Sequence, residues 1–216
     1  MCRLSEIHLA NQQKPDIVCL IKNQIIQNNM KKIIVSMHIS LDGFVAGLNG
    51  EMNWIKFDEE LFNFVGTMTN EADTALYGRK TYEMMHNYWP TADQKPNATK
   101  HDIEHAKWYK QSQKIVVSTT LNESGLEKTK VIGNNLAENI KKLKQENGKN
   151  IIVFGSASVT HFLFNKGLID EFWLFVNPVV IGSGIPLFKE IKSTVNLKFA
   201  GCKQFSCGVA GLHYLK

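Results

Sequence analysis

The sequence is poor in cysteine, and it lacks any long hydrophobic run. Only four of its 216 residues are cysteines, and no two of them have the C-x-x-C spacing typical of a zinc site. We therefore expect no disulfide framework and no structural metal, as in a reduced cytoplasmic protein. No apolar run approaches the roughly 18 residues that cross a membrane. The apolar patch at residues 17–21 is too short for the core of a signal peptide.

A concentrated basic region is also missing. The chain carries 25 lysines and arginines against 20 aspartates and glutamates, a formal net charge of +5 at pH 7. These cations are spread along the sequence, which argues against nucleic acid or a membrane surface as a partner. An evenly positive protein still suits a phosphorylated small molecule. With 44% hydrophobic residues, the chain has enough apolar material for one packed domain.

Residues 1–29 differ in composition from the rest of the chain. We expect them to be a weakly ordered N-terminal extension with no part in the chemistry, followed by one domain over residues 30–216. In that domain strand patterns alternate with helical spacings and end in strands alone. This order predicts an α/β fold with a mostly parallel sheet and an antiparallel C-terminal edge. Strands are expected at 33–39, 74–77, 114–118, 130–132, 151–154, 171–177, 197–205 and 209–215; helices at 58–68, from 79, at 136–146 and ending near 165; loops at 40–53 and around 90–100.

Two junctions between a strand and a helix have the residues of an anion site. One is Gly78-Arg79-Lys80-Thr81, and the other is Gly155-Ser156-Ala157-Ser158. A helix N-terminus presents free backbone N–H groups, to which Arg79 and Thr81 add side-chain donors. Taken singly, each motif is more often a tight turn or a helix cap, and neither is a G-x-G-x-x-G or P-loop fingerprint. Together, two such turns suffice to hold both halves of a dinucleotide.

Five motifs occur in the order found in one known family. They are Ser40-Leu41-Asp42-Gly43-Phe44-Val45-Ala46, Gly78-Arg79-Lys80-Thr81-Tyr82-Glu83, Ile115-Val116-Val117-Ser118-Thr119, Val153-Phe154-Gly155-Ser156 and Pro178-Val179-Val180-Ile181-Gly182-Ser183-Gly184-Ile185-Pro186-Leu187-Phe188. With them, residues 30–215 resemble the dihydrofolate reductase-like fold. They are most similar to its branch containing the C-terminal reductase domain of the bifunctional riboflavin-biosynthesis deaminase/reductase. The H-x-E and P-C-x-x-C ligands of the zinc deaminase domain are absent, so the chain resembles a stand-alone reductase domain.

The resemblance implies that NADPH lies across the carboxyl ends of the sheet, where open α/β sheets bind ligands. It places the cofactor's 2′-phosphate at Arg79, with Ser118 and Thr119 beside it. Val45 and Ala46 would border the nicotinamide. The later turn has Ser156 where a second glycine is often found, which narrows access to the backbone. The implied residues around the pyrophosphate are Gly78, Lys80, Thr81, Gly155, Ser156, Ala157 and Ser158.

Hydride transfer also needs a route for a proton, and two acids are candidates. Asp42 lies in the loop after the first strand, where Asp-Gly equally well makes a turn. Glu60 begins the stretch Glu60-Leu61-Phe62-Asn63-Phe64, which resembles the helix from which folate reductases present a buried carboxylate to the pterin. Acids in a first helical turn also favour the helix electrostatically, so a structural role for Glu60 stays open. We predict Asp42 and Glu60 as the catalytic residues.

Arginine is scarce, and this bears on the substrate. The chain has only Arg3 and Arg79. Folate reductases resemble one another in clamping the substrate's carboxylate with an arginine just before the strand equivalent to 115–118. Here that stretch is Lys110-Gln111-Ser112-Gln113-Lys114, and lysine lacks the planar two-pronged grip. The resemblance then implies reduction of the ribose of a phosphoribosylamino-pyrimidine. The alternatives are a dihydrofolate reductase and a dinucleotide-binding protein of this fold without catalysis.

The remaining expectations concern partners and metals. The apolar run 172–175, followed by 178–188, is richer than one sheet face requires and suggests a homodimer, as the resemblance also implies. His101 and His105 are four residues apart, as helical metal ligands are, but their charged neighbours favour a solvated helix. We therefore expect a small-molecule reductase without a metal.

Overall fold

Eight strands form one sheet in the order β5-β4-β3-β6-β1-β7-β10-β9. The structure is a computed structural model and describes residues 30–216. The strands from β5 to β7 run parallel to their neighbours, whereas β10 is antiparallel to both β7 and β9. The strands are β1 (Ile33–Ser40), β3 (Ala72–Gly78), β4 (Gln113–Val117), β5 (Thr129–Ile132), β6 (Asn150–Phe154), β7 (Glu171–Asn177), β9 (Lys198–Gln204) and β10 (Ala210–Leu215), with a separate pair formed by β2 (Phe44–Ala46) and β8 (Ile185–Pro186).

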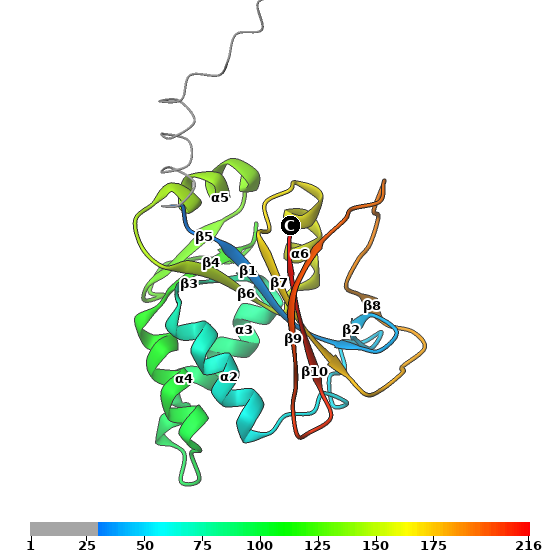
Figure 1. Ribbon diagram of the computed structural model, residues 1–216. Helices are drawn as coiled ribbons and strands as arrows, with labels where there is room; N and C mark the ends of the chain where they lie inside the picture. Colours follow the sequence, from blue (N-terminus) through cyan, green and yellow to red (C-terminus); the bar gives the residue numbers. More distant parts are fainter. Residues whose placement is uncertain (1–29) are drawn as a thin grey trace, which may run out of the picture. The chain divides into compact units, whose positions relative to one another are not determined.

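Helices connect the parallel strands and cover both faces of the sheet (Figure 1), because parallel neighbours require a crossover connection. Three helices supply buried side chains to the cluster on one face, and two supply them to the cluster on the other. The first group is α2 (Glu59–Asn70), α3 (Arg79–Tyr88) and α4 (Lys100–Gln111), with the 3₁₀ helix η1 (Trp89–Gln94); the second is α5 (Leu136–Gln145) and α6 (Ala157–Asn165). The domain therefore has three layers.

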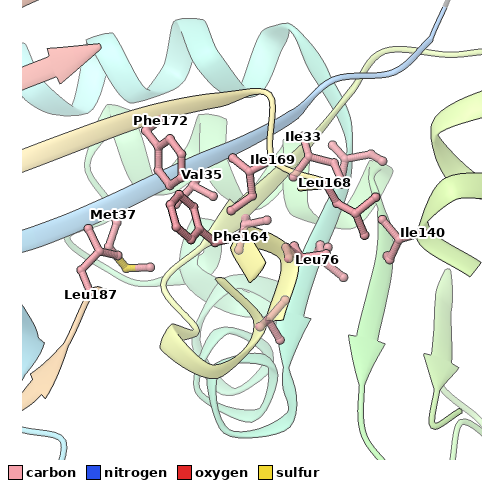
Figure 2. Close-up of a cluster of buried hydrophobic side chains, with 14 of the residues drawn as sticks. Ile33, Val35, Met37, Leu76, Ile140, Phe164, Leu168, Ile169, Phe172 and Leu187 are labelled. Carbon is pink, nitrogen blue, oxygen red and sulfur yellow. The ribbon is translucent and has the colours of Figure 1, made fainter. Parts of the chain in front are cut away.

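The two faces of the sheet have cores of different composition. Against α5 and α6 the buried cluster consists of Ile, Val, Leu, Met and Phe side chains alone, and Figure 2 shows Phe164, Leu168 and Ile169 packed beside Val35 and Phe172 of the strands. Against α2, α3 and α4 the cluster also contains Tyr77, Tyr82 and Tyr109. The hydrophobic cluster on the first face therefore has no polar atoms on its rings, and that on the second carries tyrosine hydroxyls.

The central strand β1 extends beyond one of its two neighbours. Its register with β6 ends where Ser36 lies beside Phe154, and the N–H of Gly155 then donates to the carbonyl of Ser36 at 3.4 Å. The residues from Met37 to Ser40 continue along β7 only. The carboxyl half of β1 thus borders the turn between β6 and α6, at the edge where open α/β sheets bind ligands.

The helices differ in how their N-termini are capped. Asp58 accepts the N–H of Leu61 at the start of α2, and Thr99 forms a reciprocal capping box with Asp102 at the start of α4. Gly78 and Ser156, which precede α3 and α6, form no side-chain cap. The first N–H groups of these two helices are therefore left for solvent or a ligand.

The predicted α/β fold, with its parallel sheet and antiparallel C-terminal edge, is confirmed. Two local predictions are wrong. The segment 40–53 is not all loop, since it contains β2, and the segment around 90–100 is largely occupied by η1 and the start of α4. Both elements are too short to show a period in sequence. The predicted extension, residues 1–29, lies outside the described residues. Among the described helices, none is long and apolar enough to cross a bilayer.

Candidate functional site

A hydrogen bond joins the two turns that the sequence singled out. The N–H of Gly78, at the end of β3, donates to Ser156 Oγ, at the start of α6, with 2.9 Å between the atoms. A Cβ on Gly78 would lie 2.5 Å from that same oxygen, so only glycine fits without moving the serine. The strand order explains the approach, because β3 and β6 are adjacent and both end at this edge.

This junction brings two uncapped helix N-termini together. Gly155 and Ser156 both have positive φ, +60° and +58°, which turns the chain sharply from β6 into α6. Glycine adopts this conformation freely and serine does so at a cost, and here Ser156 gains the bond from Gly78 in return. Thr81, in the first turn of α3, lies against Gly155, since a Cβ on that glycine would be 3.5 Å from Thr81 Cγ2. Free N–H groups and helix dipoles converging on one place suit an anion such as a diphosphate.

Arg79 lies at the β4 side of this junction. Its Nε contacts Glu83 Oε1 at 2.7 Å, and one terminal nitrogen donates to Thr120 Oγ1 at 2.6 Å. Thr120 is itself placed by Ser118, whose Oγ accepts the N–H groups of Thr120 and Leu121. The predicted neighbour Thr119 lies in the same turn and is exposed. The guanidinium is thus exposed and oriented by side chains from two elements, without being buried.

Asp42 holds a loop in place. Its carboxylate accepts the N–H groups of Gly182 and Ile181, at 2.8 and 3.3 Å. The hydroxyl of Ser40, and then these backbone donors, lower the pKa of Asp42 below its ordinary value. The side chain is therefore an ionised acceptor at neutral pH. The structure shows a positioning contact for Asp42, and its catalytic role stays a prediction.

The same loop covers the residues predicted to border a nicotinamide. Val45 and Ala46 are buried, and β2 pairs with β8 through Ala46 and Ile185. A Cβ on Gly184 would collide with the carbonyl oxygen of Ala46, so the loop requires glycine there. Both predicted residues therefore lie on a strand that pairs with the segment 178–188, and the contact with a cofactor stays a prediction.

Glu60 faces the β9–β10 hairpin. Its carboxylate contacts Lys203 Nζ at 3.1 Å and the hydroxyl of Ser206 at 3.2 Å, and 44% of the side chain is exposed. Asp58, the N-cap residue of α2, is occupied by the N–H groups of Leu61 and Cys207. Neither acid has the buried setting in which folate reductases hold their carboxylate. A catalytic role for Glu60 stays a prediction without a supporting contact.

Sequence reasoning missed His38, on the carboxyl half of β1. Its ring stacks on Phe175 with 5.1 Å between centroids, and its Nδ1 lies 3.3 Å from Asn177 Nδ2. Burial lowers the pKa of His38 to about 4. Asn177 is fully buried, and its Oδ1 accepts the N–H of Lys56, which fixes the segment before α2. The only signal in the sequence is a histidine inside an apolar strand pattern.

The prediction that His101 and His105 lie on a solvated helix is wrong for His105, which is 6% exposed. Its ring packs on Trp89 at 4.0 Å and on Phe154 at 5.7 Å between centroids. Burial, then the charge of His101, lowers the pKa of His105 to about 3. The apolar residues of α4 that face the sheet draw this histidine inward. Within residues 30–216, no group of three or more potential metal ligands occurs.

The lysines that replace the expected arginine are already bound. Lys110 Nζ contacts Asp93 Oδ2 at 2.7 Å. Lys114 is 4% exposed, and its ammonium donates to the carbonyls of Tyr109 and Ser112 at the end of α4. Burial lowers the pKa of Lys114. Lys114 is therefore not free to hold a substrate carboxylate, whereas Lys110 is exposed and paired with Asp93 at the surface. The predicted homodimer stays a prediction, although Val180 and Phe188 in the segment 178–188 are exposed.

Comparison with known proteins agrees with this architecture. Residues 31–210 match the model of the RibD C-terminal domain family. The Bacillus subtilis (strain 168) protein YyaP is 38% identical over 191 residues, covering 87% of this chain and 97% of YyaP.

Two solved structures share the fold. A protein of Shewanella sp. PV-4 assigned to riboflavin biosynthesis superposes with a TM-score of 0.66 at 20% identity, over 85% of this chain and 98% of its own. The diaminohydroxyphosphoribosylaminopyrimidine deaminase/5-amino-6-(5-phosphoribosylamino)uracil reductase of Thermotoga maritima does so with a TM-score of 0.62 at 15% identity, over 92% of this chain and 60% of its own. The resemblance seen in the sequence is thereby confirmed, and the chain belongs to the RibD C-terminal domain family.

Proposed function

We propose that this protein is an NADPH-dependent reductase of a pyrimidine-type or pterin-type small molecule, most like 5-amino-6-(5-phosphoribosylamino)uracil reductase. One observation carries the proposal: the Gly78–Ser156 hydrogen bond that joins two uncapped helix N-termini at the carboxyl edge of the sheet. Membership of the family supports it, as does the reductase activity in the name of the Thermotoga maritima relative. We place the enzyme in the cytoplasm.

The residues at the junction fit a dinucleotide phosphate. Gly78 and Gly155 leave the backbone open, and the first N–H groups of α3 and α6 point out of the helix ends. In this proposal Lys80, Thr81, Ala157 and Ser158 complete the pyrophosphate site. Arg79, with Ser118 and Thr119, holds the 2′-phosphate, which replaces Glu83 as the anion facing the guanidinium.

When bound, NADPH supplies a hydride. Val45 and Ala46 border the place of its nicotinamide, and the segment 178–188 covers them. Asp42 holds that segment through Gly182, which excludes water from the reacting atoms. Asp42 and Glu60 are the proposed acids, and of the two only Asp42 contacts the covering segment.

The substrate we favour lacks a carboxylate that needs a clamp. Lys114 is held by the end of α4 and Lys110 is paired with Asp93, and neither supplies the planar two-pronged grip of an arginine. The phosphoribosylamino-pyrimidine of riboflavin synthesis carries its negative charge on phosphate, for which an evenly basic protein is suited. Dihydrofolate is therefore the comparison substrate.

The first test asks whether Arg79 contacts the 2′-phosphate, which NADPH carries and NADH lacks. Arg79→Ala is expected to weaken NADPH binding by about 10- to 100-fold through loss of a charged hydrogen bond, and to leave NADH binding nearly unchanged. The NADPH affinity of the Arg79→Lys variant should lie between that of the wild-type protein and that of Arg79→Ala. Lys198→Ala, on the exposed strand β9 at the far edge of the sheet, is the matched control for a lost charge. Equal weakening of NADPH and NADH, measured by titration, would refute the role of Arg79.

The second test is turnover. NADPH oxidation is followed by absorbance with the phosphoribosylamino-pyrimidine and, separately, with dihydrofolate. Oxidation with the pyrimidine alone is the expected result. Oxidation with dihydrofolate would identify a folate reductase. Cofactor binding without oxidation by either would favour the non-catalytic alternative.

A further inference from the structure

Seven ring-bearing side chains form a connected series on the α2 side of β1. The ring of His38 lies 6.1 Å from that of Phe57, Phe57 lies 5.3 Å from Phe62, and Phe62 stacks on His101 at 4.1 Å. Through Trp89 and His105 the series continues to Phe154, the last residue of β6.

Phe154 returns the series to its starting strand. It pairs with Ser36, two residues before His38 on the same face of β1. The series, here called the aromatic circuit, thus begins on β1 and ends on β6 at the residue paired with Ser36 of β1, beside the Gly155 turn.

Hydrogen bonding fixes which ring nitrogen of His38 carries the proton. Nδ1 faces the Nδ2 amide of Asn177, which is only a donor. The orientation of that amide is set by its other contacts, because Nδ2 donates to the carbonyls of Phe175 and Ile39 while Oδ1 accepts from Lys56. A hydrogen on Nδ1 would point at the amide hydrogens. Nδ1 therefore carries no hydrogen, and Nε2 carries it.

That Nε2–H group has no partner within residues 30–216. No hydrogen bond to it occurs there, yet it is not among the buried atoms sealed from solvent without a bond. His38 itself is partly exposed. A polar group that is open but unbonded, at the carboxyl edge beside the cofactor junction, is placed to meet a ligand atom.

No charged residue compensates for the burial of this histidine. Burial alone lowers its pKa to about 4, and the carboxylates of Asp58 and Glu60 are bonded to Cys207 and Lys203 of the β9–β10 hairpin. The ring is thus a neutral hydrogen-bond donor at physiological pH. It cannot act as an anion acceptor for a protonated amidine-like ring, as a buried carboxylate does.

We propose that His38 is the specificity-determining residue of the substrate site, donating Nε2–H to a carbonyl oxygen of a planar, uncharged heterocycle that lies against the aromatic circuit. The inference rests on the proposed function and narrows it to oxo-substituted rings. An amino group in place of the carbonyl presents hydrogens to the Nε2–H, and both donors are then left without an acceptor. A site that hydrogen-bonds one ring atom discriminates strongly against the analogue that lacks the partner.

Two ring fragments test this without requiring turnover. 6-Aminouracil carries the carbonyl oxygens, and 2,4,6-triaminopyrimidine has amino groups in their place on the same ring. Each is titrated calorimetrically against the full-length protein saturated with NADP⁺ at pH 8, where both fragments are uncharged. The wild-type protein is expected to bind 6-aminouracil about tenfold or more tightly than the triamino ring.

A matched pair of variants locates the effect at one nitrogen. His38→Gln keeps an N–H donor near the position of Nε2, and His38→Asn keeps a polar group near Nδ1 and loses the donor. We expect the preference for 6-aminouracil to persist in H38Q and to vanish in H38N, with thermal unfolding showing both variants folded. NADP⁺ affinity should be the same in all three proteins.

The outcomes separate the two claims. A wild-type protein that binds neither fragment, or both equally, overturns the role of His38, and so does a preference that survives in H38N. Failure of the wild-type protein to bind NADP⁺ contradicts the proposed function instead. In that case the fragments are titrated alone, and the same preference decides for or against His38.

Discussion

The buried clusters on the two faces of the sheet differ in how many polar groups they contain. Against α5 and α6 the hydrophobic cluster consists of aliphatic, methionine and phenylalanine side chains, although Lys144 of α5 and Thr160 of α6 are buried on this side as well. Against α2, α3 and α4 the cluster contains three tyrosines, and His105 is buried among tryptophan and phenylalanine rings. Buried polar groups cost stability unless they are bonded, and the hydroxyl of Tyr77 and Nδ1 of His105 have no partner among the described residues.

This difference indicates which face is built for recognition. Among the described residues, the α6 side leaves one buried polar atom without a bond, Thr160 Oγ1, whereas the α2 side leaves three, on Tyr77, Asp93 and His105. A face that keeps unbonded polar atoms gives up stability, and such costs are commonly found at functional sites. The α2 side is also the face on which His38 and the aromatic circuit lie. Three perturbations test whether stability and recognition divide between the faces in this way.

The largest expected effect is on stability. Leu163 on α6 is fully buried and Leu61 on α2 is 1% exposed, so replacing either by alanine should lower the free energy of unfolding by about 2–5 kcal/mol. Urea unfolding measures this. Only Leu61→Ala, next to Phe62, should also weaken binding of the ring fragment. If Leu163→Ala, measured at a temperature where it is folded, also binds the ring fragment more weakly, recognition is not confined to the α2 side of the sheet.

An intermediate effect is expected from acid. The unfolded chain protonates His105 below its ordinary pKa of 6.5, whereas the folded chain does so only near pH 3. The unfolded state therefore binds more protons between these values, and the free energy of unfolding falls as the pH drops from 6.5, by up to about 1.4 kcal/mol per pH unit.

The variant His105→Phe isolates that contribution. The free energy of unfolding is measured with urea at pH 7.5 and at pH 5. Between these pH values it should fall by about 2 kcal/mol more in the wild-type protein than in the variant. The carboxylates that also titrate are common to both proteins and cancel. An equal fall in the free energy of unfolding of both proteins would show that His105 is protonated in the folded state.

The smallest effect concerns the junction where the faces meet. Gly78→Ala places a Cβ against Ser156 Oγ, which should rotate the hydroxyl away, break one hydrogen bond worth about 1 kcal/mol and weaken NADPH several-fold. The backbone itself tolerates alanine, since φ is −81°. The double variant Gly78→Ala/Ser156→Ala should bind NADPH no more weakly than Ser156→Ala alone. If the losses of NADPH affinity in the two single variants add up in the double variant, the new Cβ acts at a contact other than Ser156 Oγ.

Much of the fold could be predicted because its signals are local. Apolar runs such as 171–177 and glycine turns such as Gly78 mark strands and their ends, and the order of motifs supplied the topology by resemblance. The same reasoning placed Arg79, Ser118 and Gly155 at strand ends, and these residues do gather at one edge of the sheet. What is set within a few residues of chain was predictable.

The missed parts depend on contacts between distant residues. The tautomer of His38 is fixed by Asn177, which is 139 residues further along the chain. The burial of His105 depends on Phe154, on another element. Lys114 looked like a free cation, and only the turn at the end of α4 shows that carbonyls surround it. No periodicity within a segment carries such information.

The position of β1 has a consequence for how this chain reaches its native state. The first strand of the domain pairs with β6 and β7. Ile33 can therefore pair only after Ile151 has been synthesised, and Ile34 can complete its pairing with β7 only after Glu171 has been synthesised. Contacts over such separations slow folding. During synthesis both edges of β1 stay unpaired until β6 has emerged, and one edge stays unpaired until β7 follows; an apolar strand with an open edge is an aggregation hazard. We therefore expect chaperone dependence to be greatest for chains that end before Asn177, the last residue of β7.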